Sequence, residues 1–180
     1  MGLPSRWILR VEKYVKKILE ANVYDVAMQT PLERAPLLSS RTGSEVLLKR
    51  EDMQPVFSFK IRGAYNKISR LTPKAREKGV ITASAGNHAQ GVAMAATTLG
   101  IRSRIVMGEN TPSIKIDAVK AFGGEVILHG DTYDEAAGFA RKEATRTGAT
   151  YIHPFDDADV IAGQGTIGME IMRQYTGSLD

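Results

Sequence analysis

Residues 80–100 read Val-Ile-Thr-Ala-Ser-Ala-Gly-Asn-His-Ala-Gln-Gly-Val-Ala-Met-Ala-Ala-Thr-Thr-Leu-Gly, and this stretch decides the fold class. It opens with an apolar pair, Val80-Ile81, that is typical of a short buried strand. Small residues follow, and the alanine-rich run from Gln90 to Leu99 has the composition of a helix. Gly100 comes directly after that run, where glycine commonly ends a helix. The stretch therefore predicts a strand, a loop and a helix in this order.

The same arrangement recurs along the chain at intervals of 21 to 25 residues, because strand-like runs begin near Val80, Arg104, Glu125 and Thr150. The helical runs 90–99, 113–122 and 134–147 lie between them and end at Gly100, Gly123 and Gly148. Repeated strand–helix–strand units favour a parallel sheet whose two faces are covered by helices. The predicted fold class is thus α/β, with parallel sheets covered by helices.

The rest of the chain carries weaker patterns. Residues 11–19 predict a helix, because Val11, Val15, Ile18 and Leu19 recur at helical spacing. Pro31 and Pro36 predict an extended connector over residues 30–37. The remaining predicted elements are a strand over 44–49, helices over 61–71 and 72–78 with Gly79 as C-cap, and a last helix over 163–175 that Gly177 ends.

The stretch Ser58-Phe59-Lys60-Ile61-Arg62-Gly63 holds the strongest candidate for chemistry. Lys60 lies between two apolar residues, after the apolar run Pro55-Val56-Phe57. Burial disfavours the charged form of an amine, and a neutral amine attacks an aldehyde to form a Schiff base. The alternative is a lysine at the start of a helix, with its stem packed and its ammonium group in water.

A second candidate is the loop Ser84-Ala85-Gly86-Asn87-His88, which follows a strand and precedes a helix. Binding loops of parallel sheets lie at the carboxyl ends of the strands. Backbone N–H groups and the helix dipole make such a helix start an anion site, to which Ser84 adds a hydroxyl and Asn87 an amide. The alternative is an ordinary N-cap, for which serine and asparagine are the usual residues.

The composition of the chain argues against several classes of protein and of binding site. Apolar residues make up 43% and charged residues 24% of the 180 residues, which is typical of a globular protein. The net charge of +4 is interspersed along the chain, so nucleic-acid binding is not indicated. The absence of cysteine excludes disulfides and thiolate sites, and the three histidines are not spaced for a metal, so we expect no metal site. Residues 1–7 do not resemble a signal peptide and no apolar run is membrane-length, so we expect a cytoplasmic protein.

Together and in this order, Ser-Phe-Lys-x-Arg-Gly-Ala at 58–64 and Ser-Ala-Gly-Asn-His-Ala-Gln-Gly at 84–91 resemble the threonine and serine dehydratases. These are pyridoxal-phosphate enzymes of fold type II, the tryptophan-synthase β-like fold. The resemblance runs from about Tyr14 to the end of the chain and is strongest to the biosynthetic threonine ammonia-lyase branch. Three further stretches fit the same family: 51–57, 122–126 and 128–136.

The resemblance implies a role for each candidate. Lys60 bonds covalently to pyridoxal 5'-phosphate and takes the α-proton of the substrate, while Phe59 packs against the cofactor ring. Asn87 hydrogen-bonds the ring hydroxyl, and Ser84, Ala85, Gly86, Asn87 and His88 hold the substrate carboxylate; His88 mainly stiffens this loop. The implied reaction deaminates L-threonine, and L-serine as well, to 2-oxobutanoate or pyruvate and ammonia. It is the first step of isoleucine biosynthesis, catalysed by a homotetramer.

The resemblance also implies a domain division. Residues 1–55 begin a large cofactor domain, 56–151 form a small α/β domain, and 152–180 return to the large domain. The family's glycine-rich phosphate loop and its partner for the pyridine nitrogen lie downstream of the last residue. We therefore expect an incomplete fold and an inactive 180-residue chain. The alternatives are a serine/threonine racemase, a catabolic dehydratase, or a non-catalytic fragment of such an enzyme that pairs with other chains.

Overall fold

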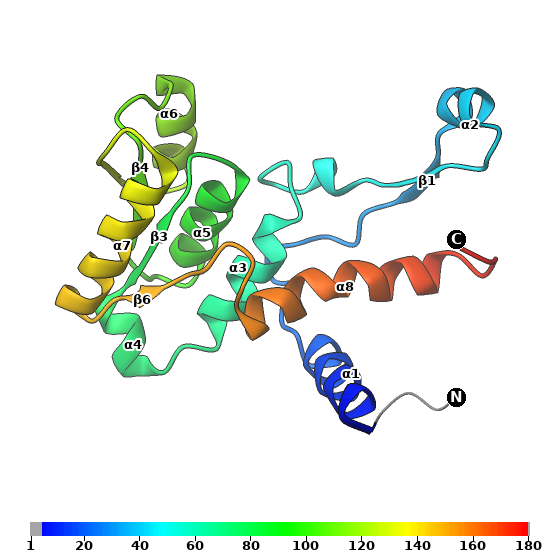
Figure 1. Ribbon diagram of the computed structural model, residues 1–180, viewed down its shortest axis with the longest axis horizontal. Coiled ribbons are helices and arrows are strands. Elements are labelled where there is room, and N and C mark those ends of the chain that lie inside the picture. The colour runs from blue at the N-terminus through cyan, green and yellow to red at the C-terminus, as the bar shows by residue number, and fades with distance from the viewer. Residues whose placement is uncertain (1–4, 180) are drawn as a thin grey trace.

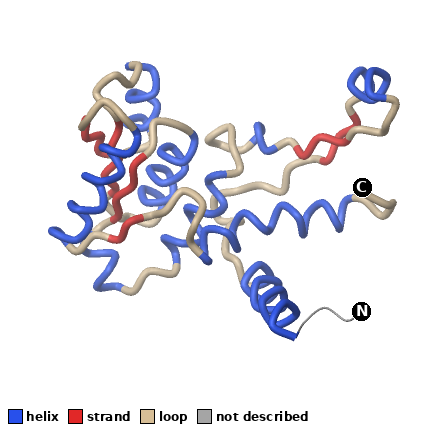
Figure 2. Tube along the Cα trace, in the orientation of Figure 1, coloured by secondary structure: helices blue, strands red, loops and turns tan. Residues whose placement is uncertain are grey.

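The computed structural model describes residues 5–179, and of residues 5–10 only the backbone. A four-stranded sheet with its helices forms one end of the molecule, and a two-stranded hairpin lies at the other (Figures 1 and 2). The elements in chain order are α1 (Ser5–Leu19), β1 (Leu32–Arg34), α2 (Pro36–Thr42), β2 (Leu47–Lys49), η1 (Glu51–Met53), α3 (Lys60–Ser69), α4 (Pro73–Lys78), β3 (Val80–Ala83), α5 (Asn87–Thr98), β4 (Ser103–Met107), α6 (Ser113–Ala121), β5 (Glu125–Leu128), α7 (Tyr133–Thr147), β6 (Thr150–Tyr151) and α8 (Ala158–Gln174).

The main sheet has the strand order β5-β4-β3-β6, and every neighbouring pair is parallel. The predicted α/β class is therefore confirmed. All four residues of β3 and all five of β4 are buried, as expected for central strands covered on both faces. Helices α5, α6 and α7 end one or two residues before glycines with positive φ at Gly100, Gly123 and Gly148, as the sequence predicts.

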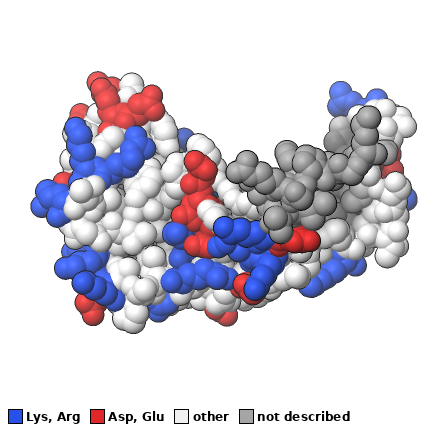
Figure 3. Space-filling model, turned by 60° about the horizontal axis from the view of Figure 1, so that its bottom comes forward, with Lys and Arg blue, Asp and Glu red and all other residues white. Residues whose placement is uncertain are grey.

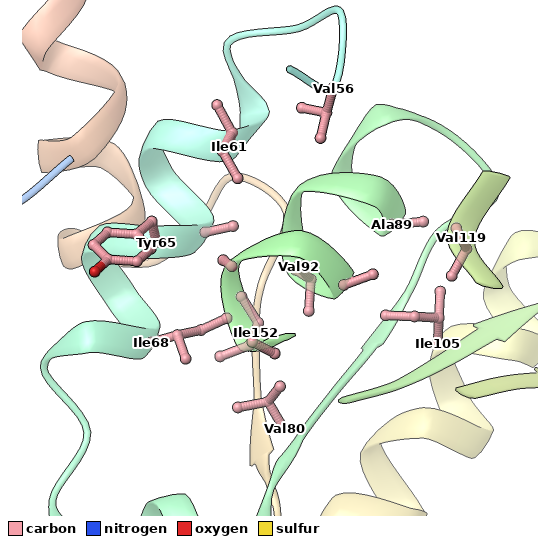
Figure 4. Packing of buried hydrophobic residues seen from close by; sticks show 14 of the residues in the cluster. Val56, Ile61, Tyr65, Ile68, Val80, Ala89, Val92, Ile105, Val119 and Ile152 are labelled. Carbon is pink, nitrogen blue, oxygen red and sulfur yellow. The ribbon is translucent and has the colours of Figure 1, made fainter. Parts of the chain in front are cut away.

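The two faces of the sheet bury different helices because side chains alternate along a strand. Ile81 and Val106 pack with alanines of α7. On the opposite face, Val80 and Ile105 pack with α5, α6 and α3 (Figure 4). Ile152, which follows β6, lies beside Val80 in this second cluster. The alanine-rich sequence of α5 lets this helix fit closely between the sheet and α3.

Helices α3 and α8 approach each other at two glycines. A Cβ atom on Gly163 would lie 2.6 Å from the carbonyl oxygen of Arg62, and one on Gly63 would lie 2.8 Å from that of Val160. Either distance is shorter than a van der Waals contact, so neither position has room for a side chain. The glycines thus set the distance between the helix that starts with Lys60 and the helix that follows the main sheet.

Charged side chains are buried beside this helix pair. Arg62 has no exposed surface and forms ion pairs with Glu51 at 2.8 Å and Glu170 at 2.6 Å. Lys49 also contacts Glu170, at 2.6 Å. Two cations and two carboxylates therefore join β2, η1, α3 and α8, and each buried charge has an opposite partner.

Three predictions about the first and last segments are wrong. The predicted connector over 30–37 is extended at Leu32–Arg34, but Pro36 and Leu37 begin α2 instead, because Pro36 occupies the first turn, where a helix accepts proline. The last helix begins at Ala158 instead of Gly163, because Asp157 caps it and Gly163 is used for the contact with α3. Its C-cap is Tyr175 and not Gly177.

The predicted domain boundaries stay a prediction. Residues 1–4, which belong to the first predicted domain and to the stretch compared with a signal peptide, lie outside the described part of the chain. Basic and acidic side chains are interspersed on the face shown in Figure 3. Within residues 5–179, no helix has the length and apolar character needed to cross a membrane.

Candidate functional site

The two candidate stretches come together because α3 and α5 pack side by side. Lys60 is the first residue of α3, and Asn87 is the first residue of α5. Gly91 makes the approach possible: a Cβ atom there would lie 3.1 Å from the backbone carbon of Lys60 and 3.2 Å from the nitrogen of Ile61. The backbone of Lys60 therefore lies against the second turn of α5, close to the Ser84–His88 loop.

The Lys60 side chain is half-buried, and its Nζ donates a hydrogen bond of 2.8 Å to the carbonyl oxygen of Pro154. Burial lowers the pKa of this amine from its ordinary value. No ion pair joins Lys60 to a carboxylate among residues 11–179, so no negative partner restores the charged form. Lys60 does begin a helix, as the alternative interpretation has it, and its amine bonds a backbone oxygen.

Two aromatic side chains lie close to Lys60 in the sequence. The Phe59 ring is 39% exposed, and its centroid is 5.3 Å from Lys60 Nζ. Phe57 is 75% exposed and has a φ of 54°, a left-handed conformation that is uncommon for an aromatic residue. The apolar run that precedes Lys60 thus buries Val56 but leaves both phenylalanines accessible.

The Ser84–His88 loop connects β3 to α5. Its turn is closed by Gly86, whose N–H donates to Ser84 Oγ at 3.2 Å. Gly86 is the N-cap of α5 and no side chain caps the helix, so the ordinary capping role for serine or asparagine is wrong. Asn87 and Gly86 are exposed, and Ser84 and Ala85 are partly exposed. An exposed, uncapped start of a 12-residue helix has the donors and the dipole for an anion.

His88 differs from the rest of the loop because its side chain is only 3% exposed. Its Nε2 lies 3.1 Å from the carbonyl oxygen of Ile152, which accepts the hydrogen bond, so Nε2 carries the proton. Burial lowers the pKa of His88 to about 4, and the imidazole is therefore neutral at pH 7. Its Nδ1 is buried without a hydrogen-bond partner among the described residues. The side chain thus ties the start of α5 to the chain that follows β6.

A cavity of about 120 Å³ adjoins the loop at the carboxyl ends of β3, β4 and β5. It is lined by Ser84 and Ala85, by the segment after β4 that includes Gly108 and Asn110, and by residues 131–133 after β5. The sequence predicts loops for binding at this edge of the sheet. A larger hollow of about 340 Å³ lies between α2 and the β1–β2 hairpin and is lined by none of the predicted site residues.

Sequence reasoning missed two contributions to the site. Pro154 contributes through its backbone oxygen, for which no side-chain motif exists. Thr82 reaches the same region through a buried hydroxyl on β3. A threonine in a strand carries no signal that separates such a contact from ordinary packing.

Comparison with known proteins gives consistent matches. The chain is 59% identical over 167 residues to "Threonine dehydratase 1 biosynthetic, chloroplastic" of Solanum lycopersicum, covering 93% of this chain and 28% of the relative. It is 56% identical over 169 residues to "L-threonine dehydratase biosynthetic IlvA" of Burkholderia multivorans, covering 92% of this chain and 33% of the relative. The chain therefore spans about a third or less of the length of these relatives.

A solved structure is similar as well. The processed form of threonine deaminase isoform 2 from Solanum lycopersicum superposes with a TM-score of 0.90 at 53% identity, over 98% of this chain and 48% of that chain. The family model described as "Pyridoxal-phosphate dependent enzyme" matches residues 23–180, which include Lys60, the Ser84–His88 loop and all four strands of the main sheet. On that match the chain belongs to the family of pyridoxal-phosphate dependent enzymes.

Proposed function

We propose that the protein carrying this chain deaminates L-threonine, and L-serine as well, to 2-oxobutanoate or pyruvate and ammonia, as the first step of isoleucine biosynthesis. The observation that carries the proposal is the Lys60 amine, which is half-buried, forms no ion pair with a carboxylate among residues 11–179 and is adjacent to the uncapped start of α5. An amine with a lowered pKa suits covalent chemistry with an aldehyde. The names of the similar proteins support threonine as the substrate.

The residues present fit pyridoxal phosphate. Lys60 supplies a partly desolvated amine for its aldehyde, and Phe59 offers an accessible ring beside that amine. Asn87 is exposed at the start of α5 and has an amide for the ring hydroxyl. When bound, the cofactor supplies an electron sink that stabilises negative charge at the substrate α-carbon.

The chain's own residues would act on the substrate as follows. Ser84, Asn87 and the backbone N–H groups of residues 85–88 bind the carboxylate, which the positive end of the α5 dipole favours. The Lys60 amine takes the α-proton, for which it must be neutral, and its half-buried position disfavours the competing charged form. His88 keeps the loop rigid behind these groups. The β-hydroxyl of the substrate is the leaving group.

Assembly and location are also proposals. We propose a homo-oligomer, a homotetramer by the resemblance in sequence, that acts in the cytoplasm. The tomato relative is named chloroplastic, so the compartment differs among similar proteins.

The first test locates the covalent bond. The 180-residue chain is mixed with pyridoxal phosphate, reduced with borohydride, digested and mapped by mass spectrometry. We expect the reduced adduct on Lys60 and its loss in Lys60→Arg. Lys67→Arg is the matched control in the same helix, because Lys67 Nζ forms an ion pair with Asp157 Oδ2 at 2.8 Å. Predominant labelling of Lys49 or Lys67 would contradict the assignment.

The second test measures the reaction. A chimera in which this chain replaces the matching part of the bacterial relative is expected to release 2-oxobutanoate from L-threonine. Lys60→Arg is expected to abolish the release. Formation of D-serine or D-threonine without the oxo acid would instead identify a racemase, and no reaction in a folded, cofactor-binding chimera would identify a non-catalytic chain. The 180-residue chain alone is expected to be inactive.

A further inference from the structure

Strand β6 is short, and the chain leaves the sheet directly after it. Its two residues, Thr150 and Tyr151, pair with Val80 and Ile81 of β3. Ile152 adds one more rung, because its N–H donates to the carbonyl oxygen of Ile81 at 2.8 Å. After Ile152 the backbone turns toward α8. The carbonyl oxygen of Ile152, the residue after β6, thus lies where the chain leaves the sheet.

Two buried side chains hold that carbonyl. Thr82 Oγ1 donates to the Ile152 oxygen at 2.8 Å, and His88 Nε2 donates to the same oxygen at 3.1 Å. Thr82 has no exposed surface, and β3 places it on the sheet face that packs against α5. A carbonyl with two acceptor sites is thus saturated by side chains from β3 and α5, which fixes its direction as well as its position.

The turn that follows is also closed. His153 Nδ1 accepts hydrogen bonds from the N–H of Phe155 at 3.3 Å and of Asp156 at 2.8 Å. Asp157 then caps α8 by accepting from Asp159 and Val160. Pro154 lies between the two fixed ends of this turn. Its carbonyl oxygen is the acceptor for Lys60 Nζ, 94 positions away in the sequence.

We propose that Thr82 and His88 are positioning residues for Lys60: by holding the Ile152 carbonyl they fix the 153–156 turn, whose Pro154 carbonyl holds the lysine amine. Because the turn contacts the amine through Pro154, we expect it also to reduce the exposure of the amine to water. The inference rests on the proposed function only for the chemical role of Lys60, since the contacts themselves involve no cofactor.

The electrostatic surroundings make the amine sensitive to this turn. His88 is neutral at pH 7, so its side chain brings no charge to the amine. Burial is the cause that lowers the pKa of Lys60, and among residues 11–179 no carboxylate forms an ion pair with it. Loosening the turn would therefore hydrate the amine and move its pKa back toward the ordinary value.

The test uses Thr82→Val, which keeps the shape of the side chain and removes the hydroxyl, with Thr82→Ser as the variant that retains it. Each chain is trace-labelled with acetic anhydride across a pH series, and labelling of Lys60 is read by mass spectrometry against exposed Lys120 in the same sample. We expect Thr82→Val to raise the labelling midpoint of Lys60 by about 0.5 pH unit, a roughly threefold loss of neutral amine at a given pH. Thr82→Ser is expected to keep the wild-type midpoint.

Two further variants make the outcome decisive. Thr98→Val removes a surface threonine hydroxyl that bonds Met94 within α5, and it is expected to leave the midpoint unchanged. His88→Met removes the second donor to Ile152 and is expected to shift the midpoint upward, so either folded variant tests the proposal. An unchanged midpoint in folded Thr82→Val or His88→Met would overturn it. Because the labelling needs no cofactor, this result is independent of whether pyridoxal phosphate reacts with Lys60.

Discussion

Lys60 and His88 are both basic side chains that burial moves toward the neutral form, but they serve different purposes. The Lys60 amine is half-buried and bonds one backbone carbonyl, that of Pro154, with no ion pair among residues 11–179. The His88 imidazole is almost fully buried and is tied to a backbone carbonyl. One is therefore available for chemistry, and the other is part of the support behind it.

The neutral state of His88 predicts a loss of stability in acid. Its pKa is about 4 in the folded chain and 6.5 as a reference. The folded pKa is depressed, so the contribution is complete above pH 6.5 and is lost as the pH falls toward 4, by on the order of 3 kcal/mol. We expect the free energy of unfolding of His88→Gln, measured with urea, to vary less across this range than that of the wild type.

The control for this measurement is His129→Gln, which removes an exposed imidazole stacked on Phe139 at 4.1 Å and leaves His88 in place. It should retain the acid-dependent loss that His88 causes. An equally steep pH dependence in His88→Gln and the wild type would show that His88 is not held neutral by the fold.

At the scale of elements, the contact between α3 and α8 depends on glycine. Both helices carry a residue without a side chain where their backbones meet, Gly63 on α3 and Gly163 on α8. Helix α7 also contains a glycine, Gly138, but a Cβ atom there would meet nothing within 4 Å. Glycine thus serves packing between α3 and α8, as Gly91 does between α3 and α5, and has no such role at Gly138 of α7.

We predict opposite effects for two glycine-to-alanine substitutions. Gly163→Ala would place a Cβ 2.6 Å from the Arg62 carbonyl oxygen and should destabilise the chain by roughly 1–3 kcal/mol, the usual cost of overpacking. Gly138→Ala should stabilise it by about 0.5–1 kcal/mol, because alanine favours a helix and restricts the unfolded chain. Urea unfolding of both variants measures the difference. A stabilising Gly163→Ala would mean that the two backbones are not in close contact.

At the scale of the whole molecule, the buried charges join segments that the main sheet does not hold. Arg62 on α3 binds Glu51 before it and Glu170 more than a hundred positions later. Lys49 and Tyr24 also bond Glu170, which brings the β1–β2 hairpin and the chain after α1 to the same carboxylate. This network connects the start of the chain with α8 close to the lysine-bearing helix.

Arg62→Met should therefore be strongly destabilising, by about 3–5 kcal/mol, because it leaves the buried Glu51 without a cationic partner among the described residues and Glu170 with Lys49 alone. The matched control is Arg146→Met, which breaks an exposed pair with Glu143 and should cost about 0–1 kcal/mol. Thermal and urea unfolding of the two variants test the contrast. If both lost the same small amount, the Arg62 network would be solvated in solution.

Sequence patterns alone were enough to predict the strands and helices of the main sheet, the parallel direction of its strands and the two stretches proposed for the site, whereas the strand order β5-β4-β3-β6 came from the structure. These features depend on local patterns: apolar runs, glycines after helices, and the lysine and loop motifs. Such patterns reflect the local preferences of each segment, although the pairing of β3 with β6 joins residues about 70 positions apart.

The groups that contact those two stretches could be identified only from the folded structure. The Pro154 carbonyl at Lys60, the Thr82 and His88 donors at Ile152, and the partners of Arg62 all join residues far apart in the chain. The predicted start of α8 at Gly163 is wrong for the same reason. The role of this glycine becomes apparent only in the fold, where the backbone of α3 packs against it. Burial and hydrogen-bond partners depend on which residues are close in space. Local sequence patterns do not specify these long-range contacts, which form only when the chain folds.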